Sequence, residues 1–267
     1  MSEYQDTAKE SIPTRPQKMR LKLLEKELHT GTDVVSFKFA RRSEDNNQNQ
    51  EDHHYYLNYN AGQYAIVDLE TKEDPEGPLR SFTIASSPTE EDFILISTRI
   101  RDTLFKQKLS GLDIGTSVNM TAPLGKFVLH EDYTKTAVFL SGGIGVTPFR
   151  SMIKYATDKQ LPIKITMFDS NRNQDNILYK MRFDEYANLN ANLKIIYSLD
   201  VSDNDWKGER GFINKAMLTK HLNTTELDNS VFYICGPPGM LKAMQKLLHD
   251  DLHIPKERIK IEVFTGY

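Results

Sequence analysis

Hydrophobic positions change their spacing about halfway along the chain. Between Met19 and Phe127 they come in short runs that alternate with polar residues or are rich in β-branched side chains, with Gly, Pro and Asp between the runs. Runs of this kind predict β-strands, and the clearest cover residues 34–39, 63–69, 93–99 and 117–120. Several short strands in succession predict an antiparallel barrel or sandwich.

From Thr134 onward apolar strands alternate with amphipathic helices. The predicted strands cover residues 137–141, 163–168, 193–199 and 231–234, and the predicted helices cover 148–157, 177–187, 214–221 and 240–249. This alternation predicts a parallel sheet with right-handed crossovers. We therefore expect two domains, an antiparallel β-barrel over residues 19–131 and an α/β parallel-sheet domain over residues 132–267. Residues 1–18 have too few apolar side chains to order and are expected to be a flexible leader, and the polar stretch 41–54 a long hairpin loop.

Composition excludes several classes of protein. Of the 267 residues 39% are hydrophobic and 27% charged, with a net charge of -3, which predicts an ordinary globular protein that does not bind nucleic acid. The single cysteine, Cys235, excludes an intramolecular disulfide, a thiolate-ligated iron–sulfur cluster and a multi-cysteine zinc site, and no metal site is expected. The first 18 residues are polar and the chain has no apolar run of about 18 residues, so we expect a cytoplasmic protein with no signal peptide and no membrane span.

Two glycine turns carry the chemistry of the second half. The first, Gly142-Gly143-Ile144-Gly145-Val146-Thr147-Pro148, follows a predicted strand and opens a helix. Glycines allow backbone N–H groups to approach a pyrophosphate, and a helix N-terminus favours negative charge. The second, Cys235-Gly236-Pro237-Pro238, has the same context, so both turns should line one crevice. The pattern predicts a dinucleotide site; tight turns that serve packing alone, with Cys235 as a buried core residue, are the alternative.

The first half contains one polar strand of interest, Arg80-Ser81-Phe82-Thr83-Ile84. Alternation places Arg80, Phe82 and Ile84 on one side of this strand. A guanidinium suits a phosphate, an aromatic ring suits a flat cofactor, and a hydroxyl can hydrogen-bond a ring nitrogen. An ordinary strand with an exposed arginine is the alternative.

Together these motifs resemble the ferredoxin–NADP reductase superfamily of flavin-dependent oxidoreductases over residues 19–267. The Arg80–Thr83 run is similar to that family's flavin motif, and Gly115-Thr116-Ser117-Val118 and Pro123-Leu124-Gly125-Lys126-Phe127 are similar to the end of its barrel. The resemblance implies that Arg80 contacts a flavin phosphate, Phe82 packs on the isoalloxazine and Thr83 lies near its N5. It also assigns further residues to cofactor binding: Ser81 and Gly125 to the flavin, and Gly142, Gly143, Gly145, Thr147, Pro148, Gly236 and Pro237 to the nicotinamide cofactor.

The last residues resemble the family ending, in which an acidic residue lies close to the reacting rings and an aromatic covers the flavin. Glu262 takes the first role by resemblance, and either Phe264 or Tyr267 the second. The segment 101–106 lacks the glycine of the usual diphosphate motif but is similar to that of some relatives. On that resemblance Arg99, Thr103 and Lys106 are assigned to the flavin, and FAD is expected rather than FMN.

The implied activity is hydride transfer from NADPH or NADH to bound FAD, with electrons passing to a small redox protein such as a ferredoxin or flavodoxin. Thr83, Cys235 and Glu262 are the expected catalytic residues. Ser170 and Arg172 favour NADPH, whereas Asp169 would favour NADH. A reductase component of a multi-protein oxygenase and a non-catalytic flavin-binding module are the alternatives, and a monomer is the default expectation.

Overall fold

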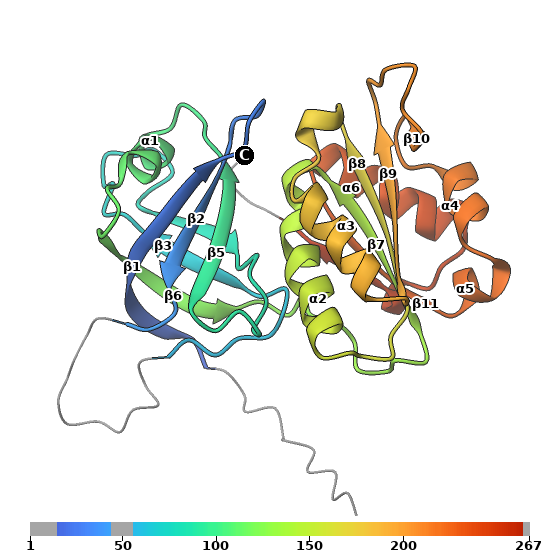
Figure 1. Cartoon of the computed structure of the whole chain (residues 1–267), viewed down its shortest axis with the longest axis horizontal. Helices are drawn as coiled ribbons and strands as arrows, with labels where there is room; N and C mark the ends of the chain where they lie inside the picture. Colours follow the sequence, from blue (N-terminus) through green and yellow to red (C-terminus); the bar gives the residue numbers. More distant parts are fainter. Residues whose placement is uncertain (1–14, 44–55, 264–267) are drawn as a thin grey trace, which may run out of the picture.

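The first half of the chain forms a six-stranded antiparallel sheet that curls into a nearly closed barrel (Figure 1). The structure, a computed structural model, describes residues 15–43 and 56–263. The strand order is β4-β3-β6-β1-β2-β5, and the N–H of Ala85 donates to the carbonyl of Leu95 at 2.7 Å where the two ends of the sheet meet. The elements are β1 (Gln17–Leu28), β2 (Val34–Ala40), β3 (Tyr64–Asp68), β4 (Leu79–Thr83), β5 (Phe93–Arg99), α1 (Leu104–Gly111) and β6 (Ser117–Leu124).

Alternation decides which side chains fill the barrel. In β1 the residues Met19, Leu21 and Leu23 are buried while their neighbours are exposed. The interior-facing apolar residues of the other strands and of α1 join them in one core. The predicted antiparallel barrel is confirmed.

The elements that were not predicted from the sequence include β1 and α1. The start of β1 corrects the expected leader, because Gln17 and Lys18 pair with Ala122 and Thr121 of β6. Backbone hydrogen bonds hold these two polar residues in the sheet, and such bonds leave no hydrophobic signature in the sequence.

The second half forms a parallel six-stranded sheet in the order β10-β9-β8-β7-β11-β12. Its strands are β7 (Thr136–Gly142), β8 (Ile165–Asn171), β9 (Leu193–Leu199), β10 (Glu209–Arg210), β11 (Ser230–Cys235) and β12 (Ile259–Glu262). Its helices are α2 (Thr147–Asp158), α3 (Lys180–Leu189), α4 (Lys215–His221), α5 (Thr224–Asp228) and α6 (Pro238–Lys246), with short turns η2 (Gly143–Val146), η3 (Gln174–Asn176), η4 (Leu247–Asp251) and η5 (Lys256–Arg258).

This sheet is covered on both faces, as the predicted α/β class requires. Phe139 of β7 packs with residues of α2 and α3, whereas its neighbours Val138 and Leu140 pack with residues of α4 and α6. Figure 1 shows α2 and α3 on the face of the sheet toward the barrel.

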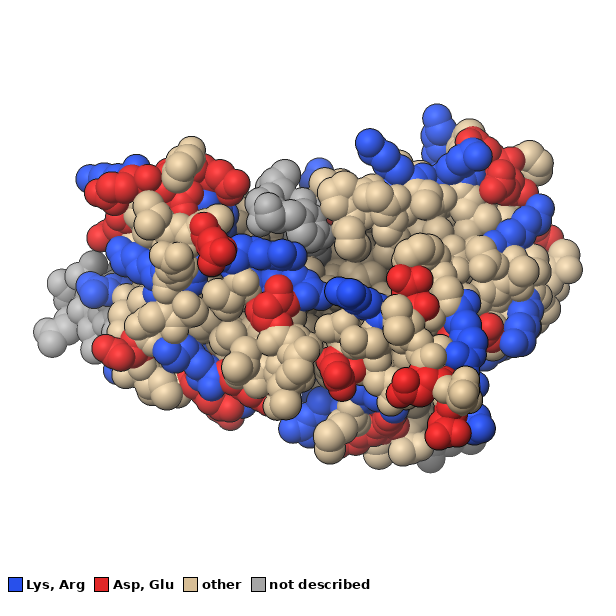
Figure 2. Space-filling view, turned by 90° about the horizontal axis from the view of Figure 1, so that it is seen from above, with Lys and Arg blue, Asp and Glu red and all other residues tan. Residues whose placement is uncertain are grey.

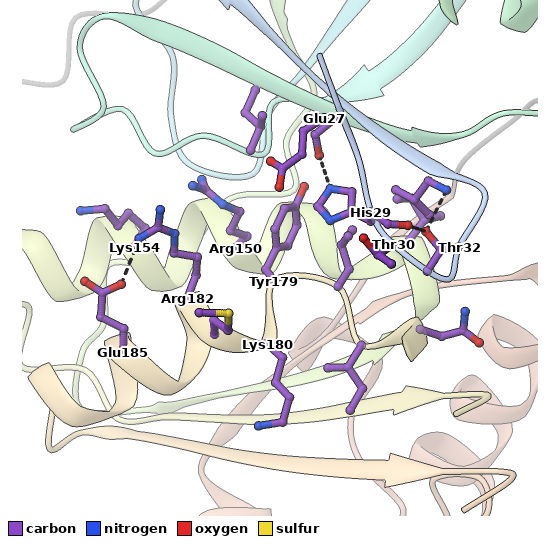
Figure 3. Close-up of a pocket in the computed structure, with 18 of the residues that line it drawn as sticks. Glu27, His29, Thr30, Thr32, Arg150, Lys154, Tyr179, Lys180, Arg182 and Glu185 are labelled. Carbon is purple, nitrogen blue, oxygen red and sulfur yellow. Dashed lines mark hydrogen bonds and ion pairs between the residues drawn. The ribbon is translucent and has the colours of Figure 1, made fainter. Parts of the chain in front are cut away.

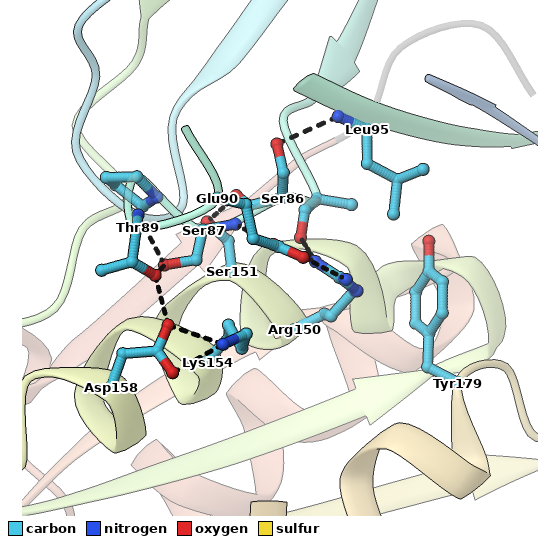
Figure 4. Close-up of polar contacts among 12 residues, drawn as sticks. Ser86, Ser87, Thr89, Glu90, Leu95, Arg150, Ser151, Lys154, Asp158 and Tyr179 are labelled. Carbon is cyan, nitrogen blue, oxygen red and sulfur yellow. Dashed lines mark hydrogen bonds and ion pairs between the residues drawn. The ribbon is translucent and has the colours of Figure 1, made fainter. Parts of the chain in front are cut away.

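Helix α2 joins the two domains (Figure 4). Arg150 donates to the carbonyl of Ala85 at 2.7 Å and pairs with Glu90, and the hydroxyl of Ser151 donates to the carbonyl of Ser86 at 2.5 Å. Ala85 and Ser86 follow directly on the segment Arg80–Ile84. The helix that begins at the first glycine turn therefore holds the barrel strand that carries the expected flavin motif.

Candidate functional site

The two glycine turns pack backbone to backbone at the carboxyl ends of β7 and β11. A Cβ atom added at Gly145 would lie 2.3 Å from the carbonyl oxygen of Cys235, and one added at Gly142 would lie 2.4 Å from the sulfur of Met240. Gly143 has a φ of +54°, in the left-handed region. Glycine is therefore required for this close approach, and the two predicted turns do line one edge of the sheet.

Thr147 and Pro148 form the start of α2. Thr147 is buried, and its hydroxyl donates to the carbonyl of Ile144 at 3.1 Å, so the side chain is already used inside the turn. Pro148 stands where its missing N–H costs the helix no hydrogen bond. The groups that this turn offers to an anion are backbone amides at the end of a 12-residue helix.

Cys235 and Glu262 lie opposite one another on the paired strands β11 and β12. Cys235 is fully buried, and burial, with the nearby Glu262 carboxylate, raises the pKa of its thiol well above the ordinary value. Burial raises the pKa of Glu262 to about 7. Glu262 can thus exchange a proton near neutral pH, whereas Cys235 stays an uncharged thiol.

The side chains of β4 alternate between exposed and buried from Leu79 to Phe82, as predicted. Arg80, Phe82 and Ile84 are all buried, so the alternative of an exposed arginine is wrong. Ser81 is exposed and Thr83 is buried. Phe82 lies in the barrel core, with its ring centroid 6.0 Å from that of Phe105.

Arg80 is already engaged within the chain. Its guanidinium pairs with Asp74 at 2.6 Å and with Glu76 at 3.1 Å, and it donates to the carbonyl oxygens of Glu76, Gly77 and Leu79. The contact of Arg80 with a flavin phosphate therefore stays a prediction.

Lys106 tests better than the already paired Arg80 whether this part of the barrel fits an anionic cofactor. Its side chain is only 6% exposed, and in the described part of the chain its ammonium group donates to the hydroxyl of Thr98 and lies 4.6 Å from the centre of the Phe82 ring. Burial, with the nearby Arg80 and Arg101, lowers the pKa of Lys106 to about 8. The carboxylate near this buried ammonium is Glu76, whose side chain is 53% exposed, so a further anion such as a phosphate group would be accommodated here.

Two further predicted residues, Thr103 and Gly125, have structural contacts that explain their identity. Thr103 caps α1, where its hydroxyl accepts from the N–H of Lys106 at 3.2 Å. Gly125 has a φ of +95°, and a Cβ there would lie 2.8 Å from the Tyr64 ring. Thr103 directly precedes α1, and Gly125 directly follows β6. Both residues therefore lie at the ends of barrel elements, where a cofactor bound to the barrel would contact them.

A cleft of about 860 Å³ is lined by residues of the barrel and of α2 and α3 (Figure 3). Arg99 and Gly143 line it, and so does Tyr179, which Figure 3 shows between His29 and Arg150. Arg99 pairs with Asp33 across the end of β5. Thr83, Cys235 and Glu262 are not among the described residues that line this cleft, which adjoins the first glycine turn through Gly143.

The residues expected to select the nicotinamide cofactor differ in exposure. Asp169 is 1% exposed, its carboxylate accepts from the side-chain amide of Asn171 at 2.8 Å, and burial raises its pKa to about 7. Arg172 is exposed and Ser170 half-buried. Among Asp169, Ser170 and Arg172, Asp169 is thus the residue whose side chain is not accessible from solvent.

Several residues of the site were not found from the sequence. Asp74, Glu90, Arg150 and Tyr179 each contact an element distant along the chain, and a single sequence carries no signal for such pairs. Phe264 and Tyr267, and most of the polar stretch 41–54, lie outside the described residues. Among the helices of residues 15–43 and 56–263, none has the length and apolar character needed to cross a bilayer.

Comparison with known proteins agrees with this architecture. Residues 139–246 match the family model described as an oxidoreductase NAD-binding domain. The chain is 26% identical to NADH-cytochrome b5 reductase 1 of Mortierella alpina over 92% of its own length and 80% of that protein. It is 27% identical to the flavohemoprotein of Bacillus subtilis, with 77% of the chain and 51% of that protein covered, so the chain spans about half the length of such relatives.

A solved structure has the same fold. The flavohem-like FAD/NAD-binding domain of nitric oxide dioxygenase from Vibrio cholerae superposes with a TM-score of 0.76 at 19% identity. The match covers 94% of this chain and 100% of that domain, so both domains and their connection are shared.

Proposed function

We propose that this chain, which resembles the ferredoxin–NADP reductase superfamily and matches the model of an oxidoreductase NAD-binding domain, is a flavoprotein reductase that oxidises a reduced nicotinamide cofactor and passes the electrons to a separate acceptor. FAD is the proposed flavin, in keeping with the FAD/NAD-binding domain that has the same fold and with the buried cation Lys106.

The observation that carries this proposal is the contact between the two glycine turns. They present backbone amides at one edge of the parallel sheet, the place where open α/β sheets bind ligands. Helix α2 starts at this edge and holds the barrel through Arg150 and Ala85, immediately beyond Thr83. A dinucleotide at the turns and a flavin on β4 would therefore face each other across a fixed interface.

The protein's own groups have simple tasks in this arrangement. A bound flavin would supply the redox chemistry, accepting a hydride from the nicotinamide. The turns hold the dinucleotide phosphates, and Lys106 balances the charge of the flavin phosphate. Glu262 can hold a proton near the reacting rings at neutral pH, and the buried, uncharged Cys235 lies opposite it on β11.

The proposed hydride donor is NADH. The Mortierella alpina relative described above is named for NADH. Arg172, which is exposed at the end of β8, is the feature that would instead favour NADPH through its 2′-phosphate. The rates with the two cofactors distinguish these assignments.

The proposed acceptor is a small acidic redox protein. Figure 2 shows Lys and Arg side chains running across the barrel lobe to the junction of the two lobes. A basic surface next to the flavin would steer an acidic carrier toward it. The relatives named for cytochrome b5 and for a flavohemoprotein indicate that acceptors differ between family members, so a reductase component of an oxygenase system is the second candidate.

The test is the visible absorption spectrum of the purified protein before and after anaerobic addition of NADH or NADPH. We expect flavin bands that bleach faster with NADH. Bands that persist with both cofactors would contradict the reductase mechanism, and no bands even after FAD is added would contradict the flavoprotein assignment altogether.

A further inference from the structure

Asp74 lies in the loop between β3 and β4 with its side chain 1% exposed. One carboxylate oxygen accepts from Arg80 at 2.6 Å and from the N–H of Glu76 at 3.0 Å. The other accepts from the N–H of Phe105 at 2.8 Å, in the first turn of α1. One buried carboxylate thus connects a guanidinium to the start of a helix.

These two partners are anion-binding groups. A guanidinium fork and a free N–H at a helix N-terminus are the donors that proteins use for phosphates. Resemblance assigns Arg80 to the flavin phosphate, and α1 follows the strand after which relatives hold the flavin diphosphate. In this chain an internal carboxylate takes both donors. The hydrogen bond from Phe105 holds the pKa of Asp74 below its usual value, so the carboxylate is ionised at neutral pH.

Lys106 adds a second buried cation to this region. It is the next residue along α1, it is buried, and its described acceptor is the uncharged Thr98 hydroxyl. Asp74 therefore balances Arg80 and the helix terminus but forms no ion pair with Lys106 among the described residues, and the carboxylate that acts on that ammonium is the exposed Glu76.

We propose that Asp74 is an internal competitor for the diphosphate subsite, holding Arg80 and the first turn of α1 until a diphosphate takes its place. The apparent affinity for a diphosphate is then reduced by the fraction of molecules in which Asp74 occupies these donors. The identity of the natural ligand as FAD rests on the proposed function, whereas the competition itself does not.

Asp74→Asn is the variant that tests this competition. Asparagine keeps an oxygen that can accept from the N–H of Phe105 but carries no charge to hold Arg80. Glu76→Gln is the matched control, since it removes a charge from the same loop at a position that pairs with Arg80 at 3.1 Å but is 53% exposed. The probes are inorganic pyrophosphate and FAD, added separately to flavin-free protein and followed by calorimetry.

We expect Asp74→Asn to bind both probes about tenfold more tightly than the unchanged chain, whereas Glu76→Gln stays within about twofold. A folded Asp74→Asn protein that binds pyrophosphate no more tightly, or more weakly, would overturn the proposal. It would then make Asp74 a support for Arg80.

Hydrogen exchange of the unchanged chain provides a second measurement that needs no variant. The amide of Glu76 donates to Asp74, so its protection should fall when pyrophosphate or FAD binds. Unchanged protection with bound probe would equally overturn the proposal. If FAD fails to bind or to bleach, the proposed function fails, while the pyrophosphate comparison still decides the role of Asp74.

Discussion

Arg150 of α2 holds Glu90 of the barrel through two hydrogen bonds, of 2.8 Å and 2.9 Å, to the two carboxylate oxygens. The two side chains are 7% and 14% exposed. This pair crosses the interface between the domains, so it connects the stability of the interface to the geometry of the site.

Removing one partner should destabilise the protein strongly. Glu90→Gln leaves the buried Arg150 without its countercharge, and we expect a loss of about 3–5 kcal/mol in the free energy of unfolding, measured with denaturant. Glu185→Gln breaks the exposed Arg182 pair and should change it by less than about 1 kcal/mol. Equal changes in the free energy of unfolding would mean that the buried Arg150–Glu90 pair stabilises the protein no more than the exposed Arg182–Glu185 pair does.

Gly145→Ala tests the contact between the two turns. Its Cβ would lie 2.3 Å from the Cys235 carbonyl, so the turns must separate, and we expect a loss of roughly 1–3 kcal/mol in stability together with weaker binding of NADH. Gly239→Ala, where a Cβ has nothing within 4 Å, should leave NADH binding unchanged. Calorimetric titration with NADH measures both variants; unaltered binding by Gly145→Ala would contradict the assigned site.

Lys106→Met should separate cofactor binding from stability. Loss of the buried ammonium removes a partner of the flavin phosphate, and we expect at least about tenfold weaker FAD binding. The flavin-free protein should be as stable as before or more so, because a desolvated charge is gone. Lys72→Met, at an exposed position, is the control for net charge. Parallel losses of stability and affinity would indicate a structural lysine instead.

Cys235 should be unreactive in the folded protein. Burial and the neighbouring Glu262 raise the pKa of its thiol, so little thiolate is present at pH 8. We expect a thiol-specific disulfide reagent to react with the native protein far more slowly than with the denatured one. Rapid labelling of the native state would show that the thiol is exposed and ionised.

Glu262 should make stability depend on pH. Its pKa rises from 4.5 to about 7 on folding, so the folded state binds the proton more tightly than the unfolded state does. Its contribution is therefore fully present below pH 4.5 and is lost as the pH rises through about 7. Glu262→Gln should weaken this decline in midpoint temperature and leave the part that the buried Asp169 causes through its own raised pKa, whereas Glu257→Gln, at an exposed position, should keep the full decline. An unchanged decline in Glu262→Gln would assign it to other groups.

The sequence by itself determined the two domain classes and the positions of the glycine turns. Strand alternation, helix periodicity and the steric freedom of glycine are local properties, so residues 93–99 and 193–199 were predicted with the bounds that the structure has. Local rules also placed Arg80, Phe82 and Ile84 on one buried side of a strand.

Only the tertiary structure decided what these side chains meet. Arg80 was expected to face a phosphate, and it faces Asp74; Asp169 stands at the end of a strand, yet it is buried. The side-chain hydrogen bonds of Arg150 and Tyr179 go to residues more than 50 positions away along the chain. Charge compensation and burial depend on groups that folding brings together from distant segments, and neither periodicity nor local spacing records which groups those are.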